Sequence, residues 1–330
     1  MNAPHVYFHP GPEAPDLPLV DGLQSPETMA AAGELADARV FLTNADGRIT
    51  AHAALWWSGT PVLEGERIGT IGGFAASDEE SAKILLDHAA DRLRVAGRRI
   101  AVGPMNGNTW RRHRYVVSGE ARGPFLLEPR NPPEYPGWWR SAGFTELSHY
   151  TSAVINLDAR RVVSPATKAR LEDSGIVIRM LDPGRYEEEL KLIHALSLKS
   201  FSANFLYTPL DEAEFLHAYA KVQSDVDPDF VRIAERGGVP CGFLFAIRDL
   251  EAETRGEKPA VIAKTLAVDP ESRSAGLGSL LVDEVHAAAF AKGYNESIHA
   301  MEHERNTSRK ITSRYGGRVF RNYALFSKPL

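Results

Sequence analysis

The chain has 330 residues, of which 25% are charged and 43% hydrophobic, and its formal net charge is −5. The composition is that of an ordinary folded protein, and the acidic balance argues against general nucleic-acid binding, which needs a basic face. No apolar run approaches the roughly 20 residues of a membrane-spanning helix. The first residues lack the basic start and apolar centre of a secretory signal. We therefore expect a cytoplasmic protein with no membrane partner, and the length suits two domains.

Cys241 is the only cysteine, which excludes an internal disulfide and a thiolate metal cluster. It lies in an apolar segment, where a buried small side chain is a better interpretation than a nucleophile. We expect no metal site anywhere in the chain.

The first half predicts a loosely packed arm followed by a compact unit. Residues 1–36 are rich in Pro, Gly and acidic residues, with one short helical candidate over 26–36. Apolar segments on either side of Asp46-Gly47 predict a β-hairpin. The pattern then predicts a strand over 67–77, an amphipathic helix over 78–97 and a strand over 99–106.

The second half predicts the same order of elements again. A hairpin around Gly237-Gly238 is followed by strand, long helix and strand, as in the first half. This order indicates an internal duplication. The expected elements are strands over 176–182, 230–235, 241–247, 261–268 and 294–301, and helices over 185–201, 210–222 and 277–292.

The copies are expected to span 1–157 and 175–330, joined by a polar linker over 158–174. The first copy carries an insertion over about 107–137 that is rich in aromatic residues, prolines and arginines. Such a segment can line a ligand pocket, or it can cover the core or the interface between the copies. The aromatic residues of the insertion and its end are Trp110, Tyr115, Phe125, Tyr135, Trp138 and Trp139.

The clearest motif joins the 261–268 strand to the 277–292 helix. Its loop reads Arg273-Ser-Ala-Gly276-Leu-Gly278. Two glycines at a helix N-terminus leave backbone N–H groups without internal partners and without a Cβ nearby, which favours binding of a phosphate or pyrophosphate. The loop lacks the lysine of nucleotide-hydrolysing loops and the three-glycine spacing of dinucleotide folds. A helix that simply begins with glycines is the alternative.

This stretch resembles motif A of the GCN5-related N-acetyltransferases (GNAT), which reads Arg/Gln-x-x-Gly-x-Gly/Ala. The resemblance implies an α/β fold of two tandem GNAT-like domains, each with a mixed, mostly antiparallel sheet flanked by helices. It also implies acetyl-CoA as acyl donor. The implied coenzyme-binding residues are Leu266, Ala267, Val268, Arg273, Ser274, Ala275, Gly276, Leu277, Gly278, Ser279, Asn306 and Arg309.

The first copy lacks this loop. Its third strand continues through Ala75-Ala76-Ser77 directly into the helix. Gly72 and Gly73 lie too early to replace the motif. We therefore expect the first copy to be degenerate and to have lost coenzyme binding.

The family's motif B, Asn-x-x-Ala-x-x-x-Tyr-x-x-x-Gly-Phe, is matched only in part. Asn306, as a helix N-cap, and Gly317 agree with it, whereas the tyrosine position is Ser313. In the family that tyrosine often protonates the departing thiolate, and a serine hydroxyl would do so poorly. Tyr315 lies two residues further on and can substitute only if the helix is irregular. In the first copy, Trp139 stands at the tyrosine position.

Four residues near the expected gap between the 261–268 and 294–301 strands are candidates for the proton from the attacking amine. They are His299, Glu302, His303 and Glu304. Strand alternation predicts that the two histidines share one face and the two glutamates the other. A solvated strand end is the alternative for each of them.

The sequence therefore predicts an N-acetyltransferase that moves an acetyl group directly from acetyl-CoA to an amine of a small molecule or peptide. Backbone N–H groups at Leu266–Val268 would stabilise the oxyanion. By the resemblance, Asn204, Phe205 and Tyr207 border the acceptor pocket. A non-catalytic acyl-CoA sensor and a protein-interaction module without coenzyme remain as alternatives.

Overall fold

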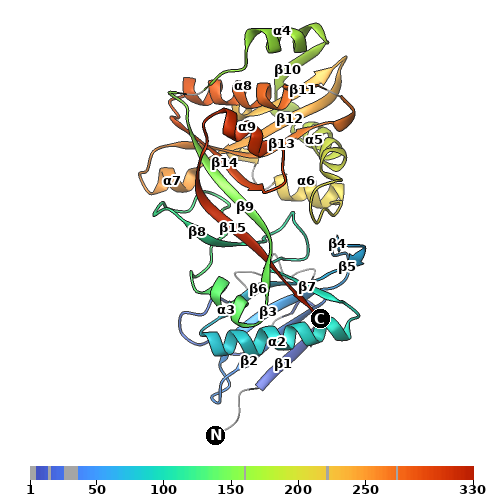
Figure 1. Cartoon of the computed structure of the whole chain (residues 1–330), viewed down its shortest axis with the longest axis vertical. Coiled ribbons are helices and arrows are strands. Elements are labelled where there is room, and N and C mark those ends of the chain that lie inside the picture. The colour runs from blue at the N-terminus through green and yellow to red at the C-terminus, as the bar shows by residue number, and fades with distance from the viewer. Residues whose placement is uncertain (1–4, 14–15, 26–35, 160, 221–222, 273) are drawn as a thin grey trace.

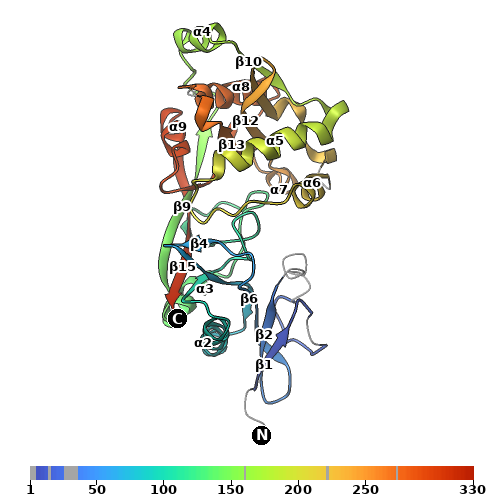
Figure 2. The same ribbon diagram turned by 90° about the vertical axis from the view of Figure 1, so that its right-hand side faces the viewer.

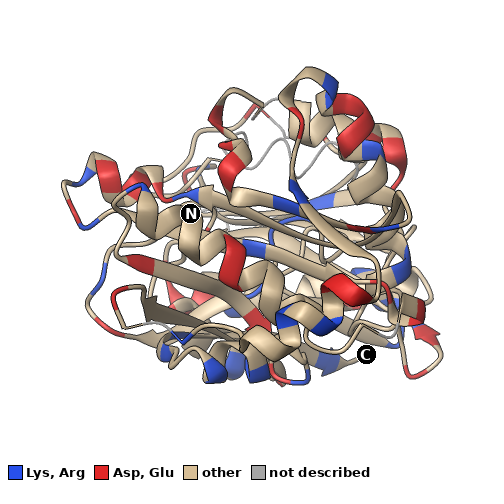
Figure 3. Cartoon of the chain, turned by 90° about the horizontal axis from the view of Figure 1, so that it is seen from above, with Lys and Arg blue, Asp and Glu red and all other residues tan. Residues whose placement is uncertain are grey.

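The computed structural model describes residues 5–13, 16–25, 36–159, 161–220, 223–272 and 274–330. The helix expected over 26–36 lies outside these residues, apart from Ala36. No helix in these ranges is both long and apolar enough to cross a membrane. Lys and Arg residues are interspersed with Asp and Glu over the elements of the fold, as Figure 3 shows from above.

Two lobes share one sheet of thirteen strands (Figure 1). The lower lobe holds the first half of the chain. A two-stranded ribbon of β4 (Val62–Leu63) and β5 (Glu66–Arg67) lies beside it. The other elements of this half are β1 (His5–Pro10), β2 (Ala38–Thr43), β3 (Ile49–Trp56), β6 (Gly69–Ala76), α2 (Glu79–Val95), β7 (Ile100–Gly103), β8 (Tyr115–Gly119), α3 (Tyr135–Ser141) and β9 (Thr145–Asn156).

The upper lobe holds the second half. Its helices are α4 (Pro165–Asp173), α5 (Tyr186–Phe201), α6 (Glu212–Ala220), α7 (Leu250–Thr254), α8 (Leu277–Ala291) and α9 (Ser308–Arg314). Short 3₁₀ turns are η2 (Pro183–Arg185), η3 (Gln223–Asp225), η4 (Pro228–Phe230) and η5 (Pro270–Ser272). Its strands are β10 (Ile176–Met180), β11 (Val231–Arg236), β12 (Val239–Arg248), β13 (Ala260–Val268), β14 (Glu296–His303) and β15 (Arg318–Pro329).

Most of the expected elements are present, but several segments differ. The arm that was expected to be loosely packed contributes β1, which pairs with β2 in the main sheet. Part of the expected polar linker forms α4, which Ser164 caps by accepting the N–H of Thr167. The insertion contributes the strand β8, which the sequence did not predict. Figure 2 shows α4 at the far end of the upper lobe.

The two halves exchange their last strands. The centre of the sheet runs β7-β15-β9-β14. The last strand of the second half, β15, therefore lies next to the first lobe, and the last strand of the first half, β9, lies next to the second lobe. β15 pairs with β7 of the first half, and β9 pairs with β14 of the second. The C-terminus therefore lies in the lower lobe, beside α2 (Figure 1).

Both exchanged strands are 12 residues long and pair with each other along most of their length. Tyr150 of β9 lies opposite Tyr323 of β15 near the middle. Phe326, beyond this point, packs in the first lobe against Trp139 and Tyr115. The core of one half thus includes a side chain from the end of the other.

We expect the halves to depend on each other for folding. A fragment of residues 175–330 would leave β14 unpaired on the side that β9 covers, and β15 without β7 and β9. That fragment alone should be unfolded or aggregated, whereas mixing it with a fragment of residues 1–174 should restore a native circular dichroism spectrum and one sedimenting species. A monomeric, cooperatively unfolding 175–330 fragment would show the expectation to be wrong.

Candidate active site

The two central strands of the upper lobe separate partway along their length. β13 and β14 pair in parallel only from Ala260/Glu296 to Ala263/His299, although both strands continue beyond that point. On β13 the register against β12 slips by one residue at Lys264, which forms a bulge. The peptide groups of β13 that face away from β12 after Ala263 therefore have no strand partner in β14. This is the gap that the resemblance implies.

β14 has a bulge of its own at the same level. Its register against β9 gains one residue between His299 and Glu302, and Met301 has φ of 53°. The Met301 N–H donates to Ser152 Oγ at 2.9 Å, and the Met301 carbonyl accepts from Arg114 Nη1 at 3.1 Å. A left-handed conformation costs a non-glycine residue free energy, so these two bonds hold the bulge in place.

The hydroxyl of Ser152 is in turn oriented by the first copy's insertion. Ser152 Oγ lies 2.9 Å from the Tyr323 hydroxyl, which donates to buried Glu128 Oε1 at 2.5 Å. Glu128 also accepts from Arg321 Nε at 3.0 Å. Burial and the Glu128 carboxylate raise the pKa of Tyr323, so its phenol stays protonated and keeps donating. Through Tyr323 and Ser152, Glu128 of the first copy thus helps to position the Met301 bulge of the second copy.

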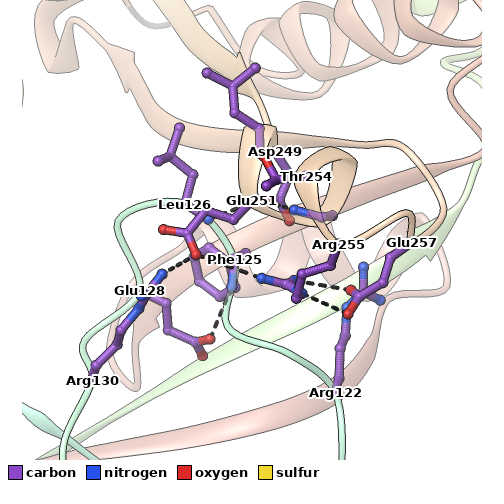
Figure 4. A network of polar contacts seen from close by, with 12 residues as sticks. Arg122, Phe125, Leu126, Glu128, Arg130, Asp249, Glu251, Thr254, Arg255 and Glu257 are labelled. Carbon is purple, nitrogen blue, oxygen red and sulfur yellow. Dashed lines mark hydrogen bonds and ion pairs between the residues drawn. The ribbon is translucent and has the colours of Figure 1, made fainter.

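The insertion is fastened to the second copy around α7 (Figure 4). The Leu126 N–H donates to buried Asp249 Oδ1 at 2.9 Å, and Arg130 pairs with Glu251. Arg122 forms an ion pair with Glu296 of β14 at 2.9 Å. These contacts give the insertion an interface role, one of the two uses that its composition allowed.

The N-terminus of α8 has no side-chain cap. Its N-cap is Gly276, at φ of 90°, and no side chain there accepts a backbone N–H. The loop before it is anchored by two arginines: Arg236 donates to Ser274 Oγ at 2.7 Å, and Arg170 of α4 donates to the Ala275 carbonyl. Arg273 lies outside the described residues. In the first turn the Leu277 N–H donates to the Ser274 carbonyl at 3.0 Å, so an anion at this helix end would meet the Gly278 and Ser279 amides.

The equivalent helix of the first copy differs at this point. Asp78 caps α2 and accepts the Ser81 N–H at 2.8 Å, so a carboxylate of the chain occupies the helix N-terminus. The strands before it are also closed: Asn106 Oδ1 accepts the Gly73 N–H at 2.8 Å, and the Tyr135 hydroxyl contacts the backbone of Ala76 at 3.0 Å. In the first copy, side chains of the chain itself therefore occupy the positions that correspond to the uncapped helix N-terminus and the split of the second copy.

His299 and Glu302 lie together on the side of β14 that faces α9. Thr312 Oγ1 is 2.7 Å from His299 Nδ1 and donates to Glu302 Oε1 at 2.8 Å. His299 Nε2 is 3.2 Å from His286 Nε2 of α8. Burial lowers the pKa of His299 to about 4 and raises the pKa of Glu302. The expected alternation is therefore wrong here, because the Met301 bulge puts His299 and Glu302 on the same side.

The motif B candidates lie away from the split or are engaged elsewhere. The Tyr315 hydroxyl donates to the Ser279 carbonyl of α8 at 2.8 Å. Ser313 is exposed, and Arg309 is exposed with Nη1 3.4 Å from the Glu304 carbonyl. Asn306 accepts the Ser308 N–H, although α9 begins only at Ser308, with Thr307 as its N-cap.

A pocket of about 430 Å³ opens at the split, between the two halves. Trp110 of the first half connects to the second half at this pocket, because its indole N–H donates to the Thr208 carbonyl at 2.7 Å. Asn204, Phe205 and Tyr207, expected to border the acceptor pocket, are among its lining residues. The lining also includes Trp110, His113, Arg114, Tyr150, Thr265, Met301, His303, Arg305 and Asn306.

His303 is one of two histidines that line this pocket, the other being His113. The His303 ring stacks on Phe205 with centroids 5.0 Å apart and meets Tyr150 edge-on at the same distance. Nδ1 accepts the Arg305 N–H at 3.2 Å, which leaves the proton of the neutral ring on Nε2. Nε2 is buried and has no partner among the described residues. Burial lowers the pKa of His303, so the ring is neutral at pH 7.

Sequence reasoning did not find Arg114, Ser152 or Glu128. Each belongs to the first half of the chain, while the motifs that point to a site belong to the second half. No local sequence pattern marks these residues, because they come close to the split only when the exchange of β9 and β15 brings the two halves together. The aromatic and arginine-rich composition of the insertion was the one available signal.

Comparisons with known proteins agree with this geometry. The model of the acetyltransferase (GNAT) family matches residues 191–312. The bacterial ceramide synthase of Caulobacter vibrioides is 28% identical over 205 residues, which cover 59% of this chain and 52% of that protein. The chain thus spans about half the length of this curated relative.

Two solved structures resemble the whole chain. A GCN5-related N-acetyltransferase from Sphaerobacter thermophilus has a TM-score of 0.53 at 16% identity, over 92% of this chain and 85% of that one. A tandem GNAT protein from the clavulanic acid biosynthesis pathway has a TM-score of 0.51 at 12% identity, over 98% of each chain. At these identities the likeness shows the fold, which is a tandem GNAT fold. The second half of this tandem fold carries the match to the GNAT family model, a family whose members use an acyl-CoA donor.

The buried His299 gives a testable pH dependence. Its folded pKa of about 4 lies below the unfolded value of 6.5, so its contribution to stability is complete above pH 6.5 and is lost as the pH falls towards 4. The loss amounts to about 3 kcal/mol. In urea unfolding at pH 7.5, 5.5 and 4.5, His299→Gln should lose less stability on acidification than the wild type. Parallel losses in the two proteins would contradict the assignment.

Proposed function

We propose that the protein is an acyl-CoA-dependent N-acyltransferase whose second copy binds the coenzyme and whose acceptor amine enters the pocket between the halves. One observation carries this proposal: the split between β13 and β14 adjoins both an uncapped helix N-terminus and a pocket. A coenzyme pyrophosphate at α8 and a pantetheine arm along the split would bring the thioester to the pocket.

The residues of the second copy suit that donor. The proposed pyrophosphate ligands are the backbone amides of Gly276, Gly278 and Ser279, because the Leu277 N–H is already bonded to the Ser274 carbonyl. The peptide groups of Leu266–Val268 that face away from β12 would pair with the pantetheine arm. Asn306 and Arg309 lie at the start of α9, on the side of the split formed by β14. The donor proposed from the sequence is acetyl-CoA. In the first copy, Asp78 and Asn106 occupy the corresponding places, which supports a copy without coenzyme.

The reaction would be direct. The amine nitrogen attacks the thioester carbonyl, the new C–N bond forms, the C–S bond breaks, and the coenzyme leaves as a thiol while the amine loses a proton. The Nε2–H of neutral His303 is placed to donate a hydrogen bond to the oxygen or sulfur that gains negative charge. His303 would thereby take the role of the motif B tyrosine, whose position is occupied by Ser313 in this chain. The cationic Arg114 and Arg305 would lower the pKa of a bound ammonium and so favour the reactive neutral amine.

A second candidate concerns the size of both substrates. The curated relative is named a ceramide synthase, and a ceramide is the amide of a fatty acid and a long-chain amino alcohol. Aromatic side chains such as Trp110, Phe201 and Phe205 line the pocket and could hold an alkyl chain. Rates with acetyl-CoA and hexadecanoyl-CoA, each paired with a short and a long-chain amino alcohol, separate the two candidates.

Coenzyme binding is tested at the α8 N-terminus. Ala275 is exposed and needs no special backbone conformation, so Ala275→Glu adds a negative charge beside the proposed pyrophosphate site without strain. Acetyl-CoA should bind the wild type in calorimetric titration and the variant at least roughly tenfold more weakly. The matched control is Ala287→Glu, on the exposed face of the same helix, which should bind normally. No binding to the wild type would overturn the proposal.

The role of His303 is tested by a pair of substitutions. His303→Phe keeps the stacking on Phe205 and removes the donor, so kcat should fall roughly 100-fold while acyl-CoA binding is unchanged. His303→Gln carries an amide N–H near the position of Nε2 and should recover part of the loss. The control His299→Gln should keep nearly full activity. Equal activity of all variants would assign the donor role elsewhere, and coenzyme binding without turnover on any amine would favour the sensor alternative.

A further inference from the structure

The pocket between the halves is cationic. Arg114 and Arg305 line it, and no aspartate or glutamate is among its lining residues in the described part of the chain. The two histidines in its wall add no charge at pH 7, because burial lowers the pKa of both His113 and His303. Glu304, near the rim, is exposed and is engaged by the backbone and ring of His149.

Arg114 is the inner of the two cations. Its guanidinium lies over the Tyr150 ring, with Cζ 4.2 Å from the centroid, and Nη1 donates to the Met301 carbonyl at 3.1 Å. Its Nε is buried without an acceptor among the described residues. Burial lowers the pKa of Arg114 to about 10, which still leaves the side chain charged at pH 7.

Such an arginine differs from the others that join the halves. Arg111, Arg122 and Arg130 each pair with a carboxylate, whereas the described residues give Arg114 no acidic partner. A buried guanidinium without a counter-charge is unfavourable, and a bound oxyanion would remove that cost. The planar guanidinium favours a carboxylate or a phosphate, which can accept two hydrogen bonds from it.

We infer that the acceptor amine carries an oxyanion group, a carboxylate or a phosphate, which Arg114 of the first copy binds while the amine faces the split. Arg114 is then a specificity-determining residue supplied to the second copy's reaction by the first. This inference rests on the proposed function. The acceptor that fits the cationic pocket is then an amino acid, a short peptide or an amino-alkyl phosphate.

The acceptor side can be tested without any variant. Acyl transfer from acetyl-CoA is measured by release of the coenzyme thiol, with phenylalanine against phenylalaninamide and with phosphoethanolamine against ethanolamine. Each pair differs in its anionic group. We expect the anionic member of one pair to have the higher kcat/KM by roughly 10- to 100-fold, the size of a charge-assisted pair of hydrogen bonds. The pair that responds identifies carboxylate or phosphate.

The protein side uses three variants. Arg114→Gln should remove the preference by raising the acceptor KM, and Arg114→Lys should restore part of it. Arg114→Lys can still donate to the Met301 carbonyl, so it should keep the calorimetric affinity for acetyl-CoA. The control is Arg112→Gln, an exposed cation of the same loop that does not line the pocket, which should behave as the wild type.

Binding is measured as well, with the coenzyme-loaded protein titrated with N-acetylphenylalanine, its amide and N-acetylphosphoethanolamine. Tighter binding of an anionic product, lost in Arg114→Gln, supports the inference. Equal affinity for charged and neutral products, or no binding of any of them at millimolar concentration, overturns it. Weakened acetyl-CoA binding in Arg114→Lys, which can keep the bond to the Met301 carbonyl, would also overturn it, because Arg114 would then serve the coenzyme. Failure of the proposed function is a separate result, seen as no acetyl-CoA binding by the wild type.

Discussion

The pairing of β9 with β15 is the contact on which the rest of the structure depends. Because each strand continues into the opposite half, the sheet is continuous and the second copy's β14 has a first-copy strand as its neighbour. The Met301 N–H then donates to Ser152 and its carbonyl accepts from Arg114, and both partners belong to the first half. The split in the second copy is therefore a property of the whole chain and would be incomplete in one domain alone.

The two helix N-termini show how the copies have diverged physically. Each helix begins with unpaired amides that need a negative charge or an acceptor. The first copy caps its helix with Asp78, whereas the second has Gly276 at the N-cap, which has no side chain to offer. The same contrast holds at the strands, where Asn106 fills the first copy's gap and bulges at Lys264 and Met301 open the second.

The sequence could predict what is local. Hairpins, the long helices and the glycine loop at Gly276 each have a pattern within a few residues, and the structure confirms the elements they predict. It could not predict the bulge at Met301, because nothing in the strand's own residues requires a left-handed conformation there. That single extra residue decides which side of β14 each candidate faces, so His299 and Glu302 are together and His303 faces the pocket.

The insertion gives the first half a part in the pocket and the split of the second half. Glu128 orients the Ser152 and Tyr323 hydroxyls, and Arg114 supplies a charge to the pocket, so the first half contributes both geometry and electrostatics. A buried ion pair such as Glu128 with Arg321 adds little net stability, but removing one partner is costly, which fixes the position of the segment that carries it. The proposed function then follows a division of labour: the insertion would choose the acceptor through its pocket-facing residues, while the second copy would bind the donor.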